Sequence, residues 1–332
     1  MSVLWCGGED IDFPVLGNTF YIFSGSIGSG HSGYNRNTIS ANSGPAKSLP
    51  FPGGAVTSAW LSARVTNTFS TSQRFVGVGL SSAGANVKGL YLGSGASSGS
   101  AVALYKYDGT TWTLLATEAG TSFTAGAKFD MQITNYGATA TVNVYINTGT
   151  GGTNLVITYS GDVTVSGMTN FDCVVTTPSG NNWQIAEIMV ADEDTRNWLG
   201  LLTMAPNANG TTQNWSNPVY TNYNPGSIND SNFTYVNATA QDTQCNLIDE
   251  PGGTYTVKMI KTAVRALATA GAATTNLKVG FNSGGTVAVG ASHALTTTFA
   301  TYEDYFTQNP VTSAPWGGAA EINALQLDMR SA

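Results

Sequence analysis

The sequence has 332 residues, a net charge of −7 and only 10% charged residues. Its 13 Lys and Arg residues are scattered singly, which excludes a nucleic-acid partner because phosphate contacts need clustered positive charge. No apolar run approaches the length of a membrane span, about 20 residues, and the first residues lack the basic start and apolar core of a secretory signal. We therefore expect no membrane insertion and synthesis in a cytosol.

Alternation of apolar and polar residues predicts β-strands along most of the chain. In Ala127–Thr134 (AKFDMQIT) and Thr139–Asn147 (TATVNVYIN), every second residue is apolar, which suits a half-buried strand and no helix. The first strand series, in chain order, is Thr19–Phe23, Lys47–Phe51, Val56–Val65, Phe75–Leu80, Lys88–Leu92, Ala101–Tyr107, Thr111–Ala116, Ala127–Thr134, Thr139–Asn147, Asn154–Tyr159, Phe171–Thr177 and Gln184–Val190.

These short strands are separated by Gly-rich turns. The turn with the clearest signal is Asp108-Gly109, which lies between Ala101–Tyr107 and Thr111–Ala116. It predicts a tight hairpin with positive φ at both turn positions. The whole series predicts an antiparallel β-sandwich or jelly roll.

The strand pattern breaks once. It stops at the charge cluster Asp192–Arg196 (DEDTR), and two Pro-, Asn- and Gly-rich stretches follow at Ala205–Gly210 and Asn214–Pro225. We therefore place a domain boundary at residue 198, giving a larger sandwich over 1–198 and a smaller one over 199–332. The second strand series is Phe233–Asn237, Thr254–Lys261, Thr275–Phe281, Thr298–Phe306 and Ile322–Arg330, with Thr262–Ala272 either a short helix or a continuation of the strand before it.

Cysteine and histidine are too sparse for a metal centre. Cys6, Cys173 and Cys245 have neither zinc nor redox spacing, so we expect buried free thiols, with an intermolecular disulfide as the alternative. His31 and His293 are isolated in the sequence. No cofactor is predicted.

Two glycine motifs match catalytic or cofactor-binding patterns by letter alone. Gly28–Gly33 fits G-x-G-x-x-G, but no helical period follows it, as a dinucleotide site requires. Gly95–Gly99 fits G-x-S-x-G, but Gly/Ser residues and a strand surround it instead of a strand, turn and helix. Both are read as loops.

Carboxylates are the more serious candidates for chemistry, because a glycosidase needs two of them facing each other. Glu187 has no second carboxylate two or four residues away on its strand. Asp192 and Asp194 lie past the strand end, beside Arg196. A solvated turn or an interdomain salt bridge is favoured over catalysis. A calcium site formed by Asp192, Glu193 and Asp194 is the remaining alternative.

Aromatic residues set among Thr and Asn form two groups. Such rings bind sugars or partner subunits when exposed, and otherwise pack across strands, which is the favoured reading. The groups are Tyr105, Tyr107 and Trp112, and Trp215, Tyr220 and Tyr223.

Three phrases resemble structural proteins of tailed bacteriophages and prophages. The opening MSVLWCGGEDIDFP resembles their start, and Gln184–Asp194 (QIAEIMVADED) resembles the closing strand of their concanavalin A-like, laminin-G-like sandwich. Trp316–Leu327 (WGGAAEINALQL) resembles the end of their C-terminal β-domain. The resemblance implies a concanavalin A-like jelly roll in a tail-fibre, collar or head-decoration protein. The E-x-D-x-x-E motif of sandwich glycosidases is absent.

Three functions follow in order of preference. The first is a non-enzymatic component of a phage particle that acts in assembly and in contact with the host surface, located in the virion and made in the host cytoplasm. Its partners would be other virion proteins, further copies of itself and a host-surface glycan. The second is a lectin-like carbohydrate-binding module, and the third a polysaccharide-degrading enzyme. No catalytic, cofactor-binding or metal-binding residue is assigned.

Overall fold

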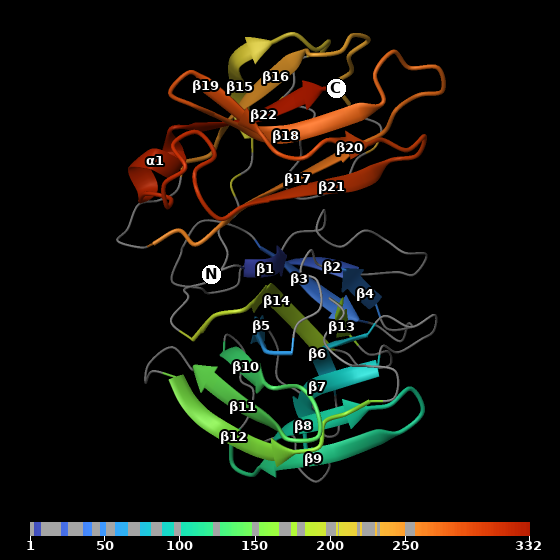
Figure 1. Ribbon diagram of the computed structural model, residues 1–332, viewed down its shortest axis with the longest axis vertical. Coiled ribbons are helices and arrows are strands. Elements are labelled where there is room, and N and C mark those ends of the chain that lie inside the picture. The colour runs from blue at the N-terminus through green and yellow to red at the C-terminus, as the bar shows by residue number, and fades with distance from the viewer. Residues whose placement is uncertain are drawn as a thin grey trace. The chain divides into compact units, whose positions relative to one another are not determined.

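The computed structural model consists almost entirely of antiparallel β-strands, which confirms the predicted all-β fold (Figure 1). Strands β1–β14 form one compact unit, and β15–β22 with helix α1 form a second. The predicted boundary at residue 198 lies outside the described residues. The structure describes residues 3–7, 21–25, 36–41, 47–50, 57–65, 74–80, 88–95, 101–121, 127–147, 153–165, 174–177, 183–196, 204, 206–217, 220, 230, 233–249 and 256–332.

Unit 1 contains an eight-stranded and a six-stranded sheet. The eight-stranded sheet has the order β12 (Thr153–Gly161), β11 (Ala140–Asn147), β10 (Lys128–Thr134), β5 (Ala59–Val65), β14 (Trp183–Ala191), β3 (Arg36–Ala41) and β2 (Tyr21–Gly25), with β1 (Val3–Gly7) paired to β14. The six-stranded sheet has the order β4 (Lys47–Pro50), β13 (Val174–Thr177), β6 (Arg74–Leu80), β7 (Lys88–Ser94), β8 (Val102–Tyr107) and β9 (Trp112–Glu118).

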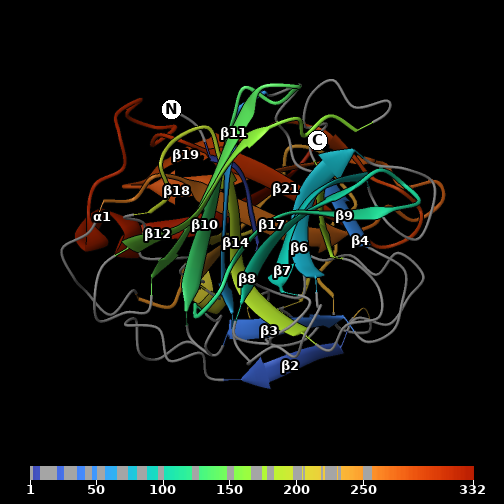
Figure 2. The same ribbon diagram turned by 90° about the horizontal axis from the view of Figure 1, so that it is seen from below.

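The two sheets of unit 1 form a jelly-roll sandwich. The chain passes repeatedly from one sheet to the other: β4 and β5 belong to different sheets, and so do β9 and β10, β12 and β13, and β13 and β14. The sheets face each other, since β12 contacts β8 and β9, and β14 contacts β6. Figure 2 shows β10, β12 and β14 beside β6, β7 and β9. The predicted antiparallel β-sandwich is confirmed for this unit.

The alternation seen in the sequence decides which side of each strand is buried. Phe129, Met131 and Ile133 of β10 are at most 1% exposed and pair in register with apolar residues of β11. Burying one such side chain stabilises the fold by about 1.5–3 kcal/mol. The intervening residues, among them Gln132, point to the opposite side of the sheet. That side carries the polar residues discussed below.

Unit 2 is a smaller sandwich of a six-stranded and a two-stranded sheet. Val264 and Tyr302 of the small sheet pack on Cys245, Val279 and Met329 of the larger one. The larger sheet has the order β15 (Pro206–Gln213), β16 (Asp242–Leu247), β22 (Leu325–Ser331), β18 (Asn276–Ser283) and β19 (Thr286–Val289), with β20 (His293–Ala294) paired to β18; β17 (Ile260–Ala266) and β21 (Ala300–Phe306) form the small one.

Several local predictions in the second half were wrong. Within the stretch Ala205–Gly210, read as a break, residues 206–210 belong to β15, which pairs with β16 although it has almost no apolar residues. Phe233–Asn237 forms a single bridge at Tyr235 instead of a strand. Ile322 lies in the five-residue helix α1 (Ala319–Asn323). For Thr262–Ala272, the alternative of a strand continuation is confirmed as far as Ala266.

The hairpin between β8 and β9 is present but differs in its turn. Tyr107 pairs with Trp112, so the loop has four residues, and Gly109 alone in it has a positive φ, +107°. Asp108 caps the loop instead, because its Oδ1 accepts hydrogen bonds from the backbone N–H groups of Thr110 and Thr111. The Asp side chain therefore does the work that a second positive φ was expected to do.

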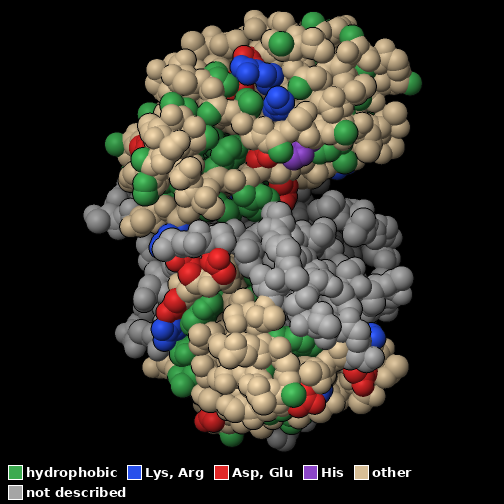
Figure 3. Space-filling view, in the orientation of Figure 1, with side chains coloured by type: hydrophobic (Ala, Val, Ile, Leu, Met, Phe, Trp, Pro, Cys, Tyr) green, Lys and Arg blue, Asp and Glu red, His purple; other side chains and the backbone are tan. Residues whose placement is uncertain are grey.

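Within the described part of the chain, no helix has the length and apolar character needed to cross a membrane. The space-filling view shows the described surface mainly in the colour of backbone and uncharged polar side chains, with charges in small separate groups (Figure 3).

Candidate functional site

The side of the eight-stranded sheet that points away from the core carries a cross-strand row of polar side chains. Trp60, Gln132, Asn143 and Thr158 pair in this order across β5, β10, β11 and β12, and we call them the polar row. The Asn143 amide donates to Gln132 Oε1 over 3.1 Å, and the Thr158 hydroxyl donates to Asn143 Oδ1 over 3.0 Å. Gln132 and Asn143 are half-buried, and Thr158 is exposed.

A second row of hydroxyl groups lies beside it. Thr134, Thr141 and Ser160 pair across β10, β11 and β12 on the same side of the sheet. They are half-buried or exposed. Together these two rows give an uncharged surface of amides and hydroxyls, here called the polar patch: Gln132, Thr134, Thr141, Asn143, Thr158 and Ser160.

Two aromatic rings adjoin the patch. Trp60 and Tyr145 stack with centroids 5.8 Å apart and an interplanar angle of 23°. The Arg196 guanidinium lies over both rings, 4.7 Å from the Tyr145 centroid and 5.5 Å from that of Trp60. Asp194 accepts from Arg196 Nε and Nη2, and these hydrogen bonds lower the pKa of Asp194 and raise that of Arg196.

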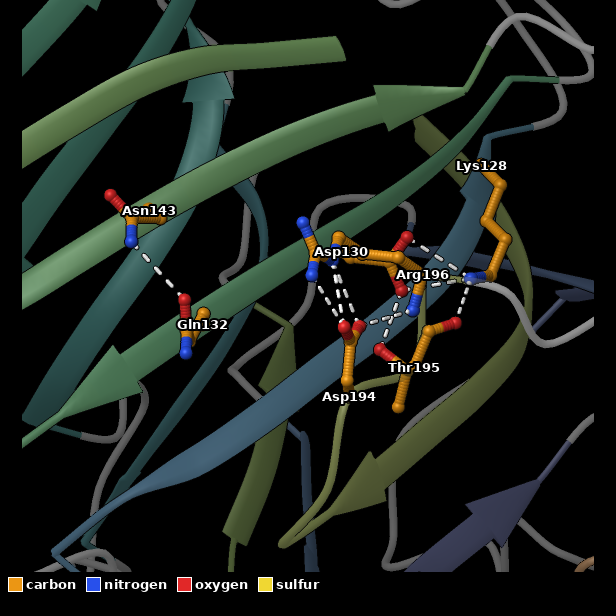
Figure 4. Close-up of polar contacts among 7 residues, drawn as sticks. All are labelled: Lys128, Asp130, Gln132, Asn143, Asp194, Thr195 and Arg196. Atoms are coloured by element: carbon orange, nitrogen blue, oxygen red, sulfur yellow. Dashed lines mark hydrogen bonds and ion pairs between the residues drawn. The ribbon is translucent and has the colours of Figure 1, made fainter. Parts of the chain in front are cut away.

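A buried ionic cluster fixes the chain next to these rings (Figure 4). Lys128 Nζ lies 2.8 and 3.0 Å from the two carboxylate oxygens of Asp130 and donates to the Thr195 carbonyl over 2.6 Å. The Thr195 hydroxyl donates to Asp130 Oδ1 over 2.6 Å. Asp130 and Thr195 are both 0% exposed. We call these three residues the clip, because they bind the segment after β14 to the polar side of β10.

The carboxylates on this face are engaged in structural pairs. Of the two alternatives favoured for this cluster, a solvated turn or an interdomain salt bridge, the turn fits: Asp194 and Arg196 pair with each other within it. Asp130 is held by the clip. Asp192 is exposed. No group of three or more His, Cys, Asp or Glu side chains suited to a metal ion occurs among the described residues, and these include Asp192, Glu193 and Asp194.

In the first predicted group of aromatics, Tyr105 and Tyr107 are buried and Trp112 is half-buried, and the rings pack across strands. Tyr105 is 3% and Tyr107 7% exposed. Trp112 stacks on Tyr107 at 4.4 Å and meets Tyr91 edge-on at 4.8 Å, and Arg74 lies 4.8 Å above Trp112. Burial raises the pKa of Tyr105. The packing interpretation of these rings is confirmed.

The second group is only partly described. Trp215 is half-buried and donates from Nε1 to the Gln241 carbonyl over 2.9 Å, whereas Tyr220 is 37% exposed. Tyr223 lies outside the described residues.

The other singled-out residues form no common site where they are described. Cys245 is a buried free thiol, as predicted, and burial raises its pKa to about 12. His293 Nε2 lies 2.9 Å from Asp304 Oδ2. The motif at Gly28–Gly33, with His31, lies outside the described residues, as do Cys173 and the motif at Gly95–Gly99 beyond Gly95; Cys6 and Glu187 belong to strands β1 and β14, and their side chains are likewise outside the description.

Sequence reasoning missed the polar row. Its residues are the polar positions of strands that the sequence predicts well, so the signal was present in Gln132 and Asn143. Which polar residues become neighbours depends on strand order and register, and a shift of one residue would turn them to the other side.

No family model and no curated protein matches the sequence. Solved structures similar to this chain include domain 4 of AbnA, a GH43 extracellular arabinanase from Geobacillus stearothermophilus, in complex with arabinotriose (15% identity over 56% of this chain and 80% of that one, TM-score 0.32). The Ca2+/Man-bound exoplasmic/lumenal domain of VIP36 gives 9% identity over 55% and 89%, with a TM-score of 0.33. CG-16, a homodimeric agglutinin from chicken liver, gives 13% identity over 41% and 92%, with a TM-score of 0.27. At these scores the likeness is partial, and the fold is assigned from the sheets of this chain itself.

Proposed function

We propose that the protein binds carbohydrate through the polar patch of unit 1. The observation that carries the proposal is the in-register row of Trp60, Gln132, Asn143 and Thr158 on adjacent strands. Amide and hydroxyl groups both donate and accept hydrogen bonds, as sugar hydroxyls do. A rigid sheet holds all of these groups in fixed positions.

The ligand is a neutral glycan, and binding is the whole function. The polar patch contains no charged side chain, and the charge of the neighbouring Arg196 is matched by Asp194. Hydrolysis of a glycosidic bond needs two carboxyl groups free to act as acid and as base or nucleophile. Asp130 and Asp194 are each held by a cation of the same chain. The enzymatic alternative is therefore not favoured.

A glycan array with variants at the patch tests this function. Asn143→Ala removes the amide that joins Gln132 and Thr158, and each lost hydrogen bond is worth about 1 kcal/mol, so the affinity for any bound glycan should fall about fivefold or more. Thr113→Ala is the matched control, because Thr113 is an exposed hydroxyl residue on β9 of the other sheet.

An array without any binder at millimolar glycan, for a protein whose circular dichroism shows intact β-structure, would rule the function out. Equal losses in the Asn143 and Thr113 variants would place the binding surface elsewhere.

A place in a tailed-phage particle, expected from the terminal phrases, stays a prediction and is compatible with a glycan-binding face. Contact with a host-surface glycan would be its role there, and assembly with further copies and other particle proteins its setting. Mass spectrometry of purified particles tests this: presence of the chain in infected cells and absence from particles would contradict it.

A further inference from the structure

The ring pair of Trp60 and Tyr145 lies at the edge of the polar patch, but it is covered by the chain itself. Trp60 belongs to the polar row and is only 8% exposed. Tyr145 lies two residues from Asn143 on the same side of β11. The rings are stacked, and the Arg196 guanidinium lies over both. A surface suited to a sugar ring is thus occupied by a planar cation.

Thr195 and the neighbouring Arg196 side chain are held by contacts of very different strength. Thr195 is fixed by the buried clip, in which both its carbonyl and its hydroxyl are bound. The described partners of the Arg196 guanidinium are Asp194 and the two rings, and the Arg196 and Asp194 side chains are each 38% exposed. Ion pairs and cation–π contacts at partly exposed positions contribute little, about 1 kcal/mol or less each. The Arg196 side chain can therefore leave the rings while Thr195 stays in place.

From this contrast we propose that the Trp60–Tyr145 ring pair is a second contact surface for the glycan and that Arg196 is its removable cover. This rests on the carbohydrate-binding function proposed above. A neutral oligosaccharide would place one sugar unit on the polar patch and stack the C–H face of the next on the rings, in exchange for the guanidinium. Asp194 would keep the displaced Arg196 paired, so that no charge is left without its partner.

The first test measures, without any sugar, whether Arg196 shields Trp60 from solvent. Arg196→Ala should increase acrylamide quenching of Trp60 fluorescence at least twofold, measured as the difference between each protein and its Trp60→Phe version. Arg265→Ala is the matched control: Arg265 forms a similar two-bond pair with Asp230 and lies 5.7 Å from the Phe299 ring centroid, in unit 2. The control should leave Trp60 quenching unchanged.

The second test measures binding of neutral trisaccharides such as arabinotriose and cellotriose. Displacement of Arg196 keeps its pair with Asp194 but breaks its two cation–π contacts, so Arg196→Ala, which has no such contacts to lose, should bind about fivefold more tightly. Arg265→Ala should give no gain in affinity.

The outcomes separate the two proposals. Unchanged quenching in Arg196→Ala overturns the cover, whatever the sugar result. Weaker or equal sugar binding by Arg196→Ala also overturns it, and a weaker one makes Arg196 a ligand contact. If quenching increases but no variant binds sugar, Arg196 does cover the rings, and the proposed carbohydrate-binding function is contradicted.

Discussion

Two buried carboxylates differ in the hydrogen bonds and ion pairs that support their charge. Asp130 and Asp328 are both 0% exposed. Asp130 is bound by Lys128 and by the Thr195 hydroxyl. Asp328 accepts one hydrogen bond from Gln244, and its Oδ2 has no hydrogen-bond partner in the described part of the chain. A buried ionised group with so little support is costly.

Asp328 should make unit 2 less stable as the pH rises. Burial raises its pKa from 3.8 to about 6, so the folded state favours the protonated form. Its stabilising contribution is full below about pH 4 and is lost as the pH rises through about 6. The difference corresponds to about 3 kcal/mol. Asp328→Asn cannot ionise and should be about 1–3 kcal/mol more stable than wild type at pH 8, measured by urea unfolding across pH 4–8.

Asp108, whose pKa is shifted in the opposite direction, serves as the control. Hydrogen bonds from Thr111 and Thr110 lower the pKa of Asp108, so its contribution is present above its ordinary pKa and is lost as the pH falls. Asp108→Ala should therefore destabilise the protein more at pH 7 than in acid, where the carboxyl group is protonated. A pH profile of Asp328→Asn that matches wild type would contradict the assignment for Asp328.

At the scale of elements, the alternation of apolar and polar residues predicted the strands correctly. The strands β10 and β11 follow the predicted alternation almost to the residue. The strand β15 reads PNANGTTQ, and nothing in its composition predicts a ladder, because its pairing depends on β16 and on bonds such as the one from the Thr212 N–H to Gln244 Oε1. The polar row could not be predicted either, because neighbours across strands are set by register.

Strand β6 has one position at which only glycine fits. Gly77 pairs with Tyr91 of β7, and a Cβ added to it would lie 2.6 Å from Tyr91 Cδ1, with the Leu90 carbonyl oxygen also in the way. Gly77→Ala should therefore destabilise the protein by about 1–3 kcal/mol, measured by urea unfolding. Gly318→Ala, where the added Cβ meets open space, should change the stability by less than about 0.5 kcal/mol. Equal effects would refute the packing argument.

At the scale of the whole molecule, the chain builds two cores and carries little charge. Every sheet is formed within a single unit. Only 10% of the residues are charged, and on the face seen in Figure 3 the charges lie in small, separate groups. Strand pairing and apolar burial, rather than surface ion pairs, therefore hold each unit together.

Hydrogen exchange followed by mass spectrometry should show that each unit responds to its own substitutions. Gly77→Ala should speed exchange in the strands beside β6 and leave β16, β18 and β22 unchanged, while Asp328→Asn should slow exchange in those three strands at pH 8 and leave unit 1 unchanged. Parallel changes in both units after either substitution would show that the two cores unfold together.

Chemical modification of the buried Cys245 thiol reports opening of unit 2. Oxidants and alkylating reagents attack the exposed thiolate, and this sulfur is neither exposed nor ionised at neutral pH, since its residue is 0% exposed and its pKa is about 12. Any adduct on Cys245 in an aged sample must therefore have formed before unit 2 folded or while it was open. The fraction of Cys245 that is oxidised or alkylated therefore measures how often the core of unit 2 has opened during storage.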